Sequence, residues 1–186
     1  MRKVTRADIV DYQTYNDQRD AIRQQVLEIK RLRRIIVGDC LNFLFETTDT
    51  IRYQVQEMMR AEKIVREQDI QHEITTYNEL LGAERELGCT LLIELDEPAV
   101  RAQRLKEWLS LPEHLYVKTD DGSIFRPKYD RAQVGDDRLS SVQYLIFAVP
   151  TGKPVAVGSD HPTLSVETRL SDEQRSALVL DLTSAD

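Results

Sequence analysis

Two charged side chains in this sequence fall on helical stripes that are otherwise apolar. At 100° per residue, Arg33 continues the apolar stripe of a helix predicted over residues 16–34. Glu62 lies in the same way on the apolar stripe of a helix predicted over residues 51–66. Because a charge buried alone is costly, we predict that Arg33 and Glu62 contact each other in the core, directly or through one water.

The sequence leaves two interpretations of this pair open. One is a structural ion pair, or an arginine at a helix end that extends its charge to solvent. The other is a ligand pocket between the first long helix and the helical hairpin that follows it. Arg34 closes the basic run 30–34 beside Arg33, so a ligand bearing phosphate or carboxylate would suit this region.

Glu94 is a second candidate for a buried carboxylate. It interrupts a strand predicted over residues 89–95 that is otherwise apolar. It can pair with an arginine such as Arg34, Arg52 or Arg60, or serve as a base. The candidate ligand-binding residues are therefore Arg33, Arg34, Glu62 and Glu94.

The sequence contains residues of the types found in metal sites and nucleophilic active sites, but their spacing completes neither kind of site. Asp69 and His72 have the spacing of one helical metal half-site, but His72 lies opposite the apolar stripe of its helix, so we expect a solvated face. Cys40 and Cys89 are far apart and are expected to be reduced and packed. His161 is expected in a turn. We predict no metal and no cofactor, and we assign no catalytic residue.

The composition restricts the class of protein. The 186 residues carry a formal charge of −7, with 41% hydrophobic and 31% charged residues, which is typical of one globular unit. The acidic balance disfavours a nucleic-acid surface. No apolar run approaches the roughly 20 residues of a membrane span, and the N-terminus lacks the apolar stretch of a signal peptide. We expect a soluble, cytoplasmic protein with neither nucleic-acid nor membrane partners.

The elements that must position these residues indicate an α+β fold. Helices predicted over residues 16–34, 51–66 and 69–81 form an N-terminal set that packs against a mainly antiparallel sheet. The strands are predicted over residues 35–46 (as two short strands or one bulged strand), 89–95, 115–119, 124–129 and 142–149. The strand 142–149 is apolar at nearly every position and is expected to be central. We predict a single α+β domain over residues 1–149 and a C-terminal appendage, residues 150–186, that packs on the same domain.

Several short segments of the sequence resemble segments that occur in the same order in a known family. They are the runs 31–38, 43–46, 50–58, 60–64, 77–81, 90–94 and 139–145. The chain thereby resembles, up to about Val149, the bacterial family filed as "domain of unknown function 3501". Asp39 departs from the Val-Gly-Pro pattern of that family. The resemblance brings no catalytic residue, and it implies association with rubrerythrin-type proteins and iron–sulfur oxidoreductase subunits by gene neighbourhood.

Two hypotheses of function follow from these observations. The first is an accessory or ligand- and partner-binding protein that works beside a rubrerythrin or iron–sulfur oxidoreductase system in redox or stress response. Its expected partners are a protein of that system and further copies of this chain in a homo-oligomer. The alternative is a small enzyme with an Arg- and Glu-lined pocket that acts on an anionic substrate. The two differ in whether Arg33, Glu62 and Glu94 converge on a cavity.

Overall fold

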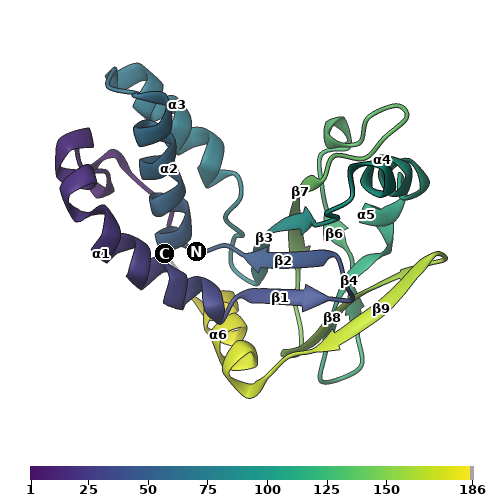
Figure 1. Cartoon of the computed structure of the whole chain (residues 1–186). Helices are drawn as coiled ribbons and strands as arrows, with labels where there is room; N and C mark the ends of the chain where they lie inside the picture. The colour runs from purple at the N-terminus through teal and green to yellow at the C-terminus, as the bar shows by residue number, and fades with distance from the viewer. Residues whose placement is uncertain (185–186) are drawn as a thin grey trace.

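The computed structural model describes residues 1–184 and shows a helical arm beside a β body (Figure 1). The arm consists of a short 3-10 helix, Arg6–Asp8, and the helices α1 (Tyr12–Arg31), α2 (Thr48–Glu62) and α3 (Glu67–Asn78). Side chains define where these helices begin. The Asp11 carboxylate accepts hydrogen bonds from the backbone N–H groups that open α1, and Thr47 and Thr50 form a capping box at the start of α2.

The helical arm has a hydrophobic core of its own. The buried residues of this core come from the N-terminal segment, α2, α3 and the end of the hairpin: Val4, Ile9, Ile51, Val55, Met59, Ile70, Ile74 and Leu81. The core of the β body is a separate cluster. The helices therefore stand beside the sheets more than they cover them.

The β body contains two antiparallel sheets. The five-stranded sheet has the order β1 (Arg34–Val37), β2 (Leu41–Phe45), β3 (Glu86–Ile93), β7 (Val142–Ala148), β6 (Pro127–Lys128). The four-stranded sheet has the order β5 (Ile124–Phe125), β4 (Leu115–Thr119), β8 (Pro154–His161), β9 (Leu164–Arg169). Alternate residues of each sheet point into the core between them, as the period of two requires.

The two sheets meet at both edges. On one side the chain passes from β5 to β6 through Arg126 alone. On the other side β9 lies against β1, where the Thr168 hydroxyl donates to the carbonyl of Ile36 at 2.9 Å. Gly38 turns the β1–β2 hairpin with a φ of 59°, and a Cβ there would approach Val166 of β9 at 3.3 Å. The body is thus a flattened barrel whose open edges are largely removed.

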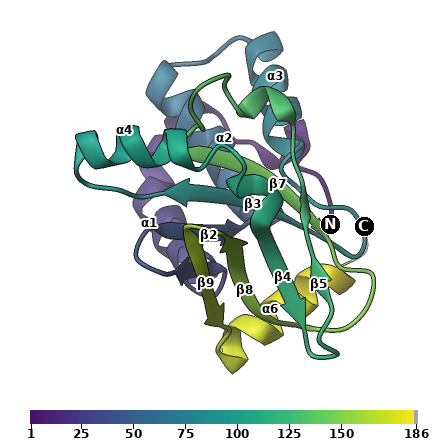
Figure 2. The ribbon, with the colours of Figure 1, turned by 90° about the vertical axis from the view of Figure 1, so that its right-hand side faces the viewer.

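Helices close the two ends of this barrel (Figure 2). At one end lie α4 (Pro98–Glu107) and α5 (Leu111–His114), which bury Leu105, Trp108 and Leu111 in the core. At the other end lies α6 (Asp172–Thr183), which begins at the capping residue Ser171. Within the described chain, no helix has both the length and the apolar character needed to cross a membrane.

The predicted α+β class and the antiparallel pairing are confirmed, and two details are corrected. The predicted strand 124–129 is two short strands, β5 and β6, which belong to different sheets because the chain crosses from one to the other. The predicted central strand 142–149 is β7, which lies next to the edge, and Tyr144 on its outer face is 41% exposed. The apolar residues on the outer face of β7 therefore lie at the surface of the sheet and are not covered on both sides.

Residues after position 149 supply β8, β9 and α6. β8 pairs with β4 on one side and β9 on the other, and Leu178 and Leu182 of α6 belong to the core of the body. The division of the chain at residue 149 stays a prediction, and a truncation test is given below.

Candidate functional site

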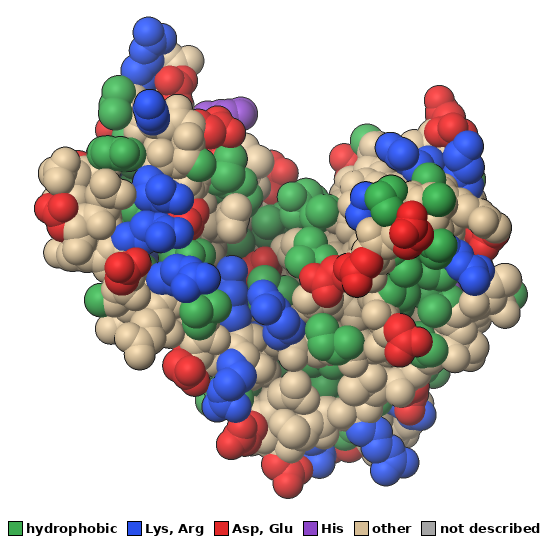
Figure 3. Space-filling model, viewed as in Figure 1, with side chains coloured by type: hydrophobic (Ala, Val, Ile, Leu, Met, Phe, Trp, Pro, Cys, Tyr) green, Lys and Arg blue, Asp and Glu red, His purple; other side chains and the backbone are tan. Residues whose placement is uncertain are grey.

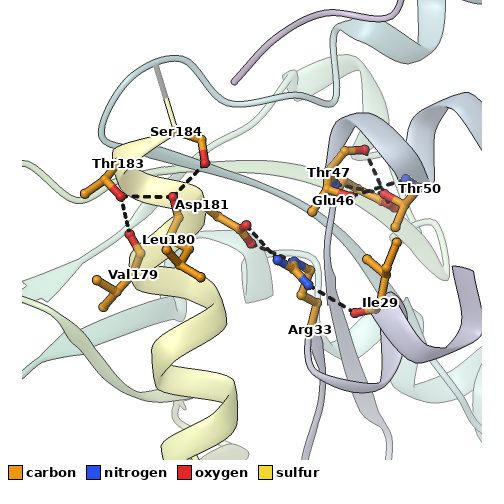
Figure 4. A network of polar contacts seen from close by, with 10 residues as sticks. All are labelled: Ile29, Arg33, Glu46, Thr47, Thr50, Val179, Leu180, Asp181, Thr183 and Ser184. Atoms are coloured by element: carbon orange, nitrogen blue, oxygen red, sulfur yellow. Dashed lines mark hydrogen bonds and ion pairs between the residues drawn. The ribbon is translucent and has the colours of Figure 1, made fainter. Parts of the chain in front are cut away.

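Arg33 pairs with Asp181 of α6 and not with Glu62 (Figure 4). Its Nε and Nη2 each donate to one Asp181 oxygen at 2.8 Å, and its Nη1 donates to the carbonyl of Ile29 at 3.3 Å. The two charged side chains are 13% and 6% exposed. Glu62 is the last residue of α2 and is exposed. The predicted Arg33–Glu62 contact is therefore wrong, although Arg33 does point inward to a carboxylate.

The helix boundaries explain this correction. α1 ends at Arg31, so Arg33 lies in the turn before β1. The direction of its side chain is therefore not set by the helical periodicity. Burial raises the pKa of Asp181, while the hydrogen bonds and charge of Arg33 oppose the rise. Each Asp181 oxygen accepts from Arg33, so this geometry is that of a structural ion pair.

Arg34 and Glu94 lie at separate points on the outward side of the five-stranded sheet. Arg34 is the first residue of β1 and is exposed. The prediction that Glu94 is buried is wrong, because β3 ends at Ile93 and Glu94 is exposed just beyond it. Its Oε1 accepts a hydrogen bond from Nδ2 of buried Asn42 at 3.0 Å. The four sequence candidates thus do not converge on one pocket.

The outward side of this sheet carries mostly apolar residues, of which some are exposed, and we call it the open face. It alternates with the core positions of β1, β2, β3 and β7 and consists of Arg34, Ile36, Asn42, Leu44, Thr90, Leu92, Val142, Tyr144 and Ile146. Ile36 of β1 is 49% and Tyr144 of β7 41% exposed, whereas Asn42 and Leu44 of β2, between them, are 4% and 6% exposed. A cavity of about 370 Å³, lined in part by Leu80, Tyr144 and Ile146, lies where the end of the arm approaches β7. Figure 3 shows a hollow between the arm and the lobe that carries α4.

A buried carboxylate, Glu46, lies where the arm joins the open face. Its Oε2 accepts from the Thr50 hydroxyl at 2.5 Å and its Oε1 from the Thr90 hydroxyl at 2.7 Å. These bonds link the start of α2 to β3, so they fix the arm against the sheet. The sequence analysis missed Glu46, although its position between the apolar run 43–45 and a helix cap is a signal that could have identified it.

Four basic side chains on or next to the arm form a set that we call the basic wall: Arg19 and Lys30 of α1, Arg60 of α2 and Arg34 of β1. The Lys30 ammonium lies 5.2 Å from the centre of the Tyr53 ring. Burial lowers the pKa of Lys30, and the charge of nearby Glu46 opposes that shift. Glu57 accepts from Arg19 Nε at 2.7 Å and from the Tyr15 hydroxyl at 2.5 Å, and these hydrogen bonds, that of Arg19 first, lower its pKa.

Two comparisons with known proteins identify the family. The family described as "Protein of unknown function (DUF3501)" matches residues 3–182. The chain belongs to the DUF3501 family. A crystal structure of a protein of unknown function from Burkholderia pseudomallei is similar to this DUF3501 protein, with 26% sequence identity and a TM-score of 0.90 over 97% of this chain and 100% of that one. No curated protein matches the sequence.

The DUF3501 protein also contains a polar cluster on the body that the sequence analysis missed. Asp160 of β8 lies 3.0 Å from Nδ1 of His114, and both of its oxygens accept hydrogen bonds from Arg126. The bonds to Arg126 and His114 lower the pKa of Asp160 to about 2. The three residues are far apart in sequence, so spacing alone could not join them. Their contacts tie the strand crossing at Arg126 to the end of α5.

The other residues considered in the sequence analysis of this DUF3501 protein lie in the core, at a strand end or on the surface. His161 is the last residue of β8 and is 5% exposed, so the prediction that it lies in a turn is wrong. The turn that joins β8 to β9 follows it directly, and the Nδ1 of His161 accepts from the Thr163 backbone N–H at 3.3 Å. His72 is exposed on α3, as predicted. Cys40 and Cys89 are free and buried, and burial raises the pKa of both thiols. Among residues 1–184, no three His, Cys, Asp or Glu side chains are grouped as a metal site.

Proposed function

We propose that this protein is a non-catalytic accessory protein that binds an acidic, amphipathic segment of a protein partner on its open face. The observation that carries the proposal is the exposure of apolar side chains there, with Ile36 at 49% and Tyr144 at 41%. Exposed apolar side chains in a hollow are typical of protein-binding sites, and aromatic residues such as Tyr144 supply much of the affinity at such sites.

The charges around the hollow favour an acidic partner. Of the four cationic side chains of the basic wall, Arg19 pairs with Glu57 and Asp20, and Arg60 pairs with Glu57. Lys30 and Arg34 belong to no ion pair among residues 1–184, and the charge of Glu46 acts on Lys30. Figure 3 shows Lys and Arg side chains along the arm side of the hollow. In a chain of net charge −7, the positive charges of Lys30 and Arg34 would orient an acidic partner and speed its association.

The setting that we propose is the cytoplasm, beside a rubrerythrin-type or iron–sulfur oxidoreductase protein, and its support is the family resemblance. The enzyme alternative loses its geometric basis, because Arg33 is paired with Asp181, Glu62 lies on the arm and Glu94 lies beyond β3.

Calorimetric titration with the purified rubrerythrin-type protein and iron–sulfur subunit of the same organism tests the proposal. We expect one of them to bind, and we expect Tyr144→Lys to weaken binding about tenfold or more, because it places a charge in the apolar contact. The matched control is Leu180→Lys, since Leu180 is 64% exposed on α6, away from the open face.

Two results would contradict parts of the proposal. If neither protein binds, the redox setting is wrong. If Tyr144→Lys binds as the wild type does, the open face is not the binding site. A homo-oligomer detected by light scattering and dissociated by Tyr144→Lys alone would show that a second copy of the chain, and not another protein, occupies this face.

A further inference from the structure

A polar pocket lies between α4 and the loop that leads into β7, and none of the residues that line it belongs to the open face. Its volume is about 480 Å³, which is within the range of small-molecule sites. Its polar lining includes Arg101 of α4, Gln133 and Arg138 of the loop, and Ser140 and Ser141 before β7. None of the residues that line it is acidic.

The two arginines carry the argument. The only hydrogen bond found for the Arg101 side chain in the described chain is from Nη1 to the carbonyl of Leu95 at 3.0 Å. Neither Arg101 nor Arg138 belongs to an ion pair among residues 1–184. Most other arginines of this acidic chain do have carboxylate partners, for example Arg19 and Arg33. Two guanidinium groups that share a pocket without a carboxylate repel each other and favour an anion between them.

Hydroxyl groups complete a set of hydrogen-bond donors. Ser140 Oγ accepts from the backbone N–H of Val142 at 3.2 Å, so its own hydrogen remains free to donate. Ser141 lies next to it in the lining. Guanidinium and hydroxyl donors together match the oxygens of a phosphate or carboxylate group.

Backbone contacts hold the pocket walls in place. Leu139, 1% exposed, donates its N–H to the carbonyl of Leu105 at 2.9 Å and thereby fastens the loop to α4. The Ser141 carbonyl accepts from the N–H of Ile93 at 2.8 Å, and the Gln133 side chain bonds both backbone groups of Tyr144. A site built on such anchored walls loses little conformational entropy when a ligand binds.

We propose that this pocket binds a small anionic molecule through a phosphate or carboxylate group held by Arg101 and Arg138. The proposal does not rest on partner binding on the open face. The pocket shares no residue with that face, although Gln133 of its lining bonds the backbone of Tyr144. It concerns binding of the anion, and it assigns no reaction.

Isothermal titration calorimetry with three probes tests the proposal: inorganic phosphate, glycerol 3-phosphate and succinate, each in a buffer free of other oxyanions. We expect at least one probe to bind, and the stronger of the last two identifies the anionic group. We expect Arg138→Gln to weaken that binding about tenfold or more, because a charge-assisted bidentate contact is lost. Arg23→Gln is the matched control, since it removes the same charge from an exposed position of α1.

Because Arg138 is exposed, we expect its substitution to leave folding unchanged, and an unchanged thermal midpoint checks this. Absence of binding by all three probes would overturn the proposal. Equal weakening by Arg138→Gln and Arg23→Gln would also overturn it, because the effect would then come from net charge and not from the pocket.

Discussion

Replacement of Arg33 by methionine should destabilise the protein strongly. The substitution removes two hydrogen bonds of 2.8 Å and leaves the Asp181 carboxylate, 6% exposed, without its cation. Loss of one partner from a buried pair costs about 3–5 kcal/mol. We expect about 3 kcal/mol here, because Arg33 is itself 13% exposed and water can enter the vacated space. For a chain of this length that corresponds to a decrease of about 6–12 °C in the thermal midpoint.

Denaturant unfolding of a double-mutant cycle measures the coupling. Arg33→Met together with Asp181→Leu should be less destabilised than the sum of the single variants, by about 2 kcal/mol. Arg31→Met is the matched control, because Arg31 pairs with Glu28 and Glu173 on the surface, where such a pair contributes about 0–1 kcal/mol.

The pH dependence provides a second readout of the same pair. Burial raises the pKa of Asp181 even in the presence of Arg33, so loss of Arg33 should raise it further. A folded state with a raised carboxyl pKa binds its proton more tightly than the unfolded chain does, so the defect of Arg33→Met should shrink as pH falls through that raised pKa. Additive single variants, or a defect that is constant from neutral pH to about pH 4, would refute the buried-pair reasoning.

Three further predictions concern the body. A chain ended at residue 149 lacks β8 and α6, so we expect no cooperative thermal transition by circular dichroism; a cooperative transition would instead establish residues 1–149 as an independent domain. In Arg126→Gln, the pKa of Asp160, about 2 in the wild type, should rise toward its ordinary value, as measured by a carboxyl NMR titration. The stability that Arg126 adds above about pH 4 should disappear as pH falls toward 2. An unchanged pKa would contradict the assigned cause. Cys89 is buried and the pKa of its thiol is raised, so iodoacetamide should alkylate it far more slowly in the native protein than in urea, and equal rates would show that the site is open.

Local signals predicted most of the elements, because they act within a few residues. The helices predicted over residues 16–34, 51–66 and 69–81 correspond to α1, α2 and α3, with ends that differ by a few residues. The strand crossing at Arg126 was not predictable in this way. A two-residue strand has no periodicity, and the sheet to which it belongs depends on distant partners.

In the candidate site, too, the sequence predicted which side chains point inward better than it predicted their distant partners. Periodicity identified Arg33 as an inward charge, but its partner Asp181 lies 148 residues away in sequence. The same reasoning applied to α6 would have marked Asp181, since it stands between the buried residues Leu178 and Leu182. Glu62 and Glu94 were misplaced because each lies at or just beyond the end of its element, where the stripe no longer predicts burial.

The separate cores of the arm and the body imply an order of folding during synthesis. All core residues of the arm lie between Val4 and Leu81, so the arm can form its contacts while the rest of the chain is still being translated. The barrel core includes Leu178 and Leu182, and it cannot be completed until the last helix has left the ribosome. Until then the apolar interior of the barrel is exposed at one end, where it can aggregate with other chains. This is the stage at which we expect chaperones to bind the chain.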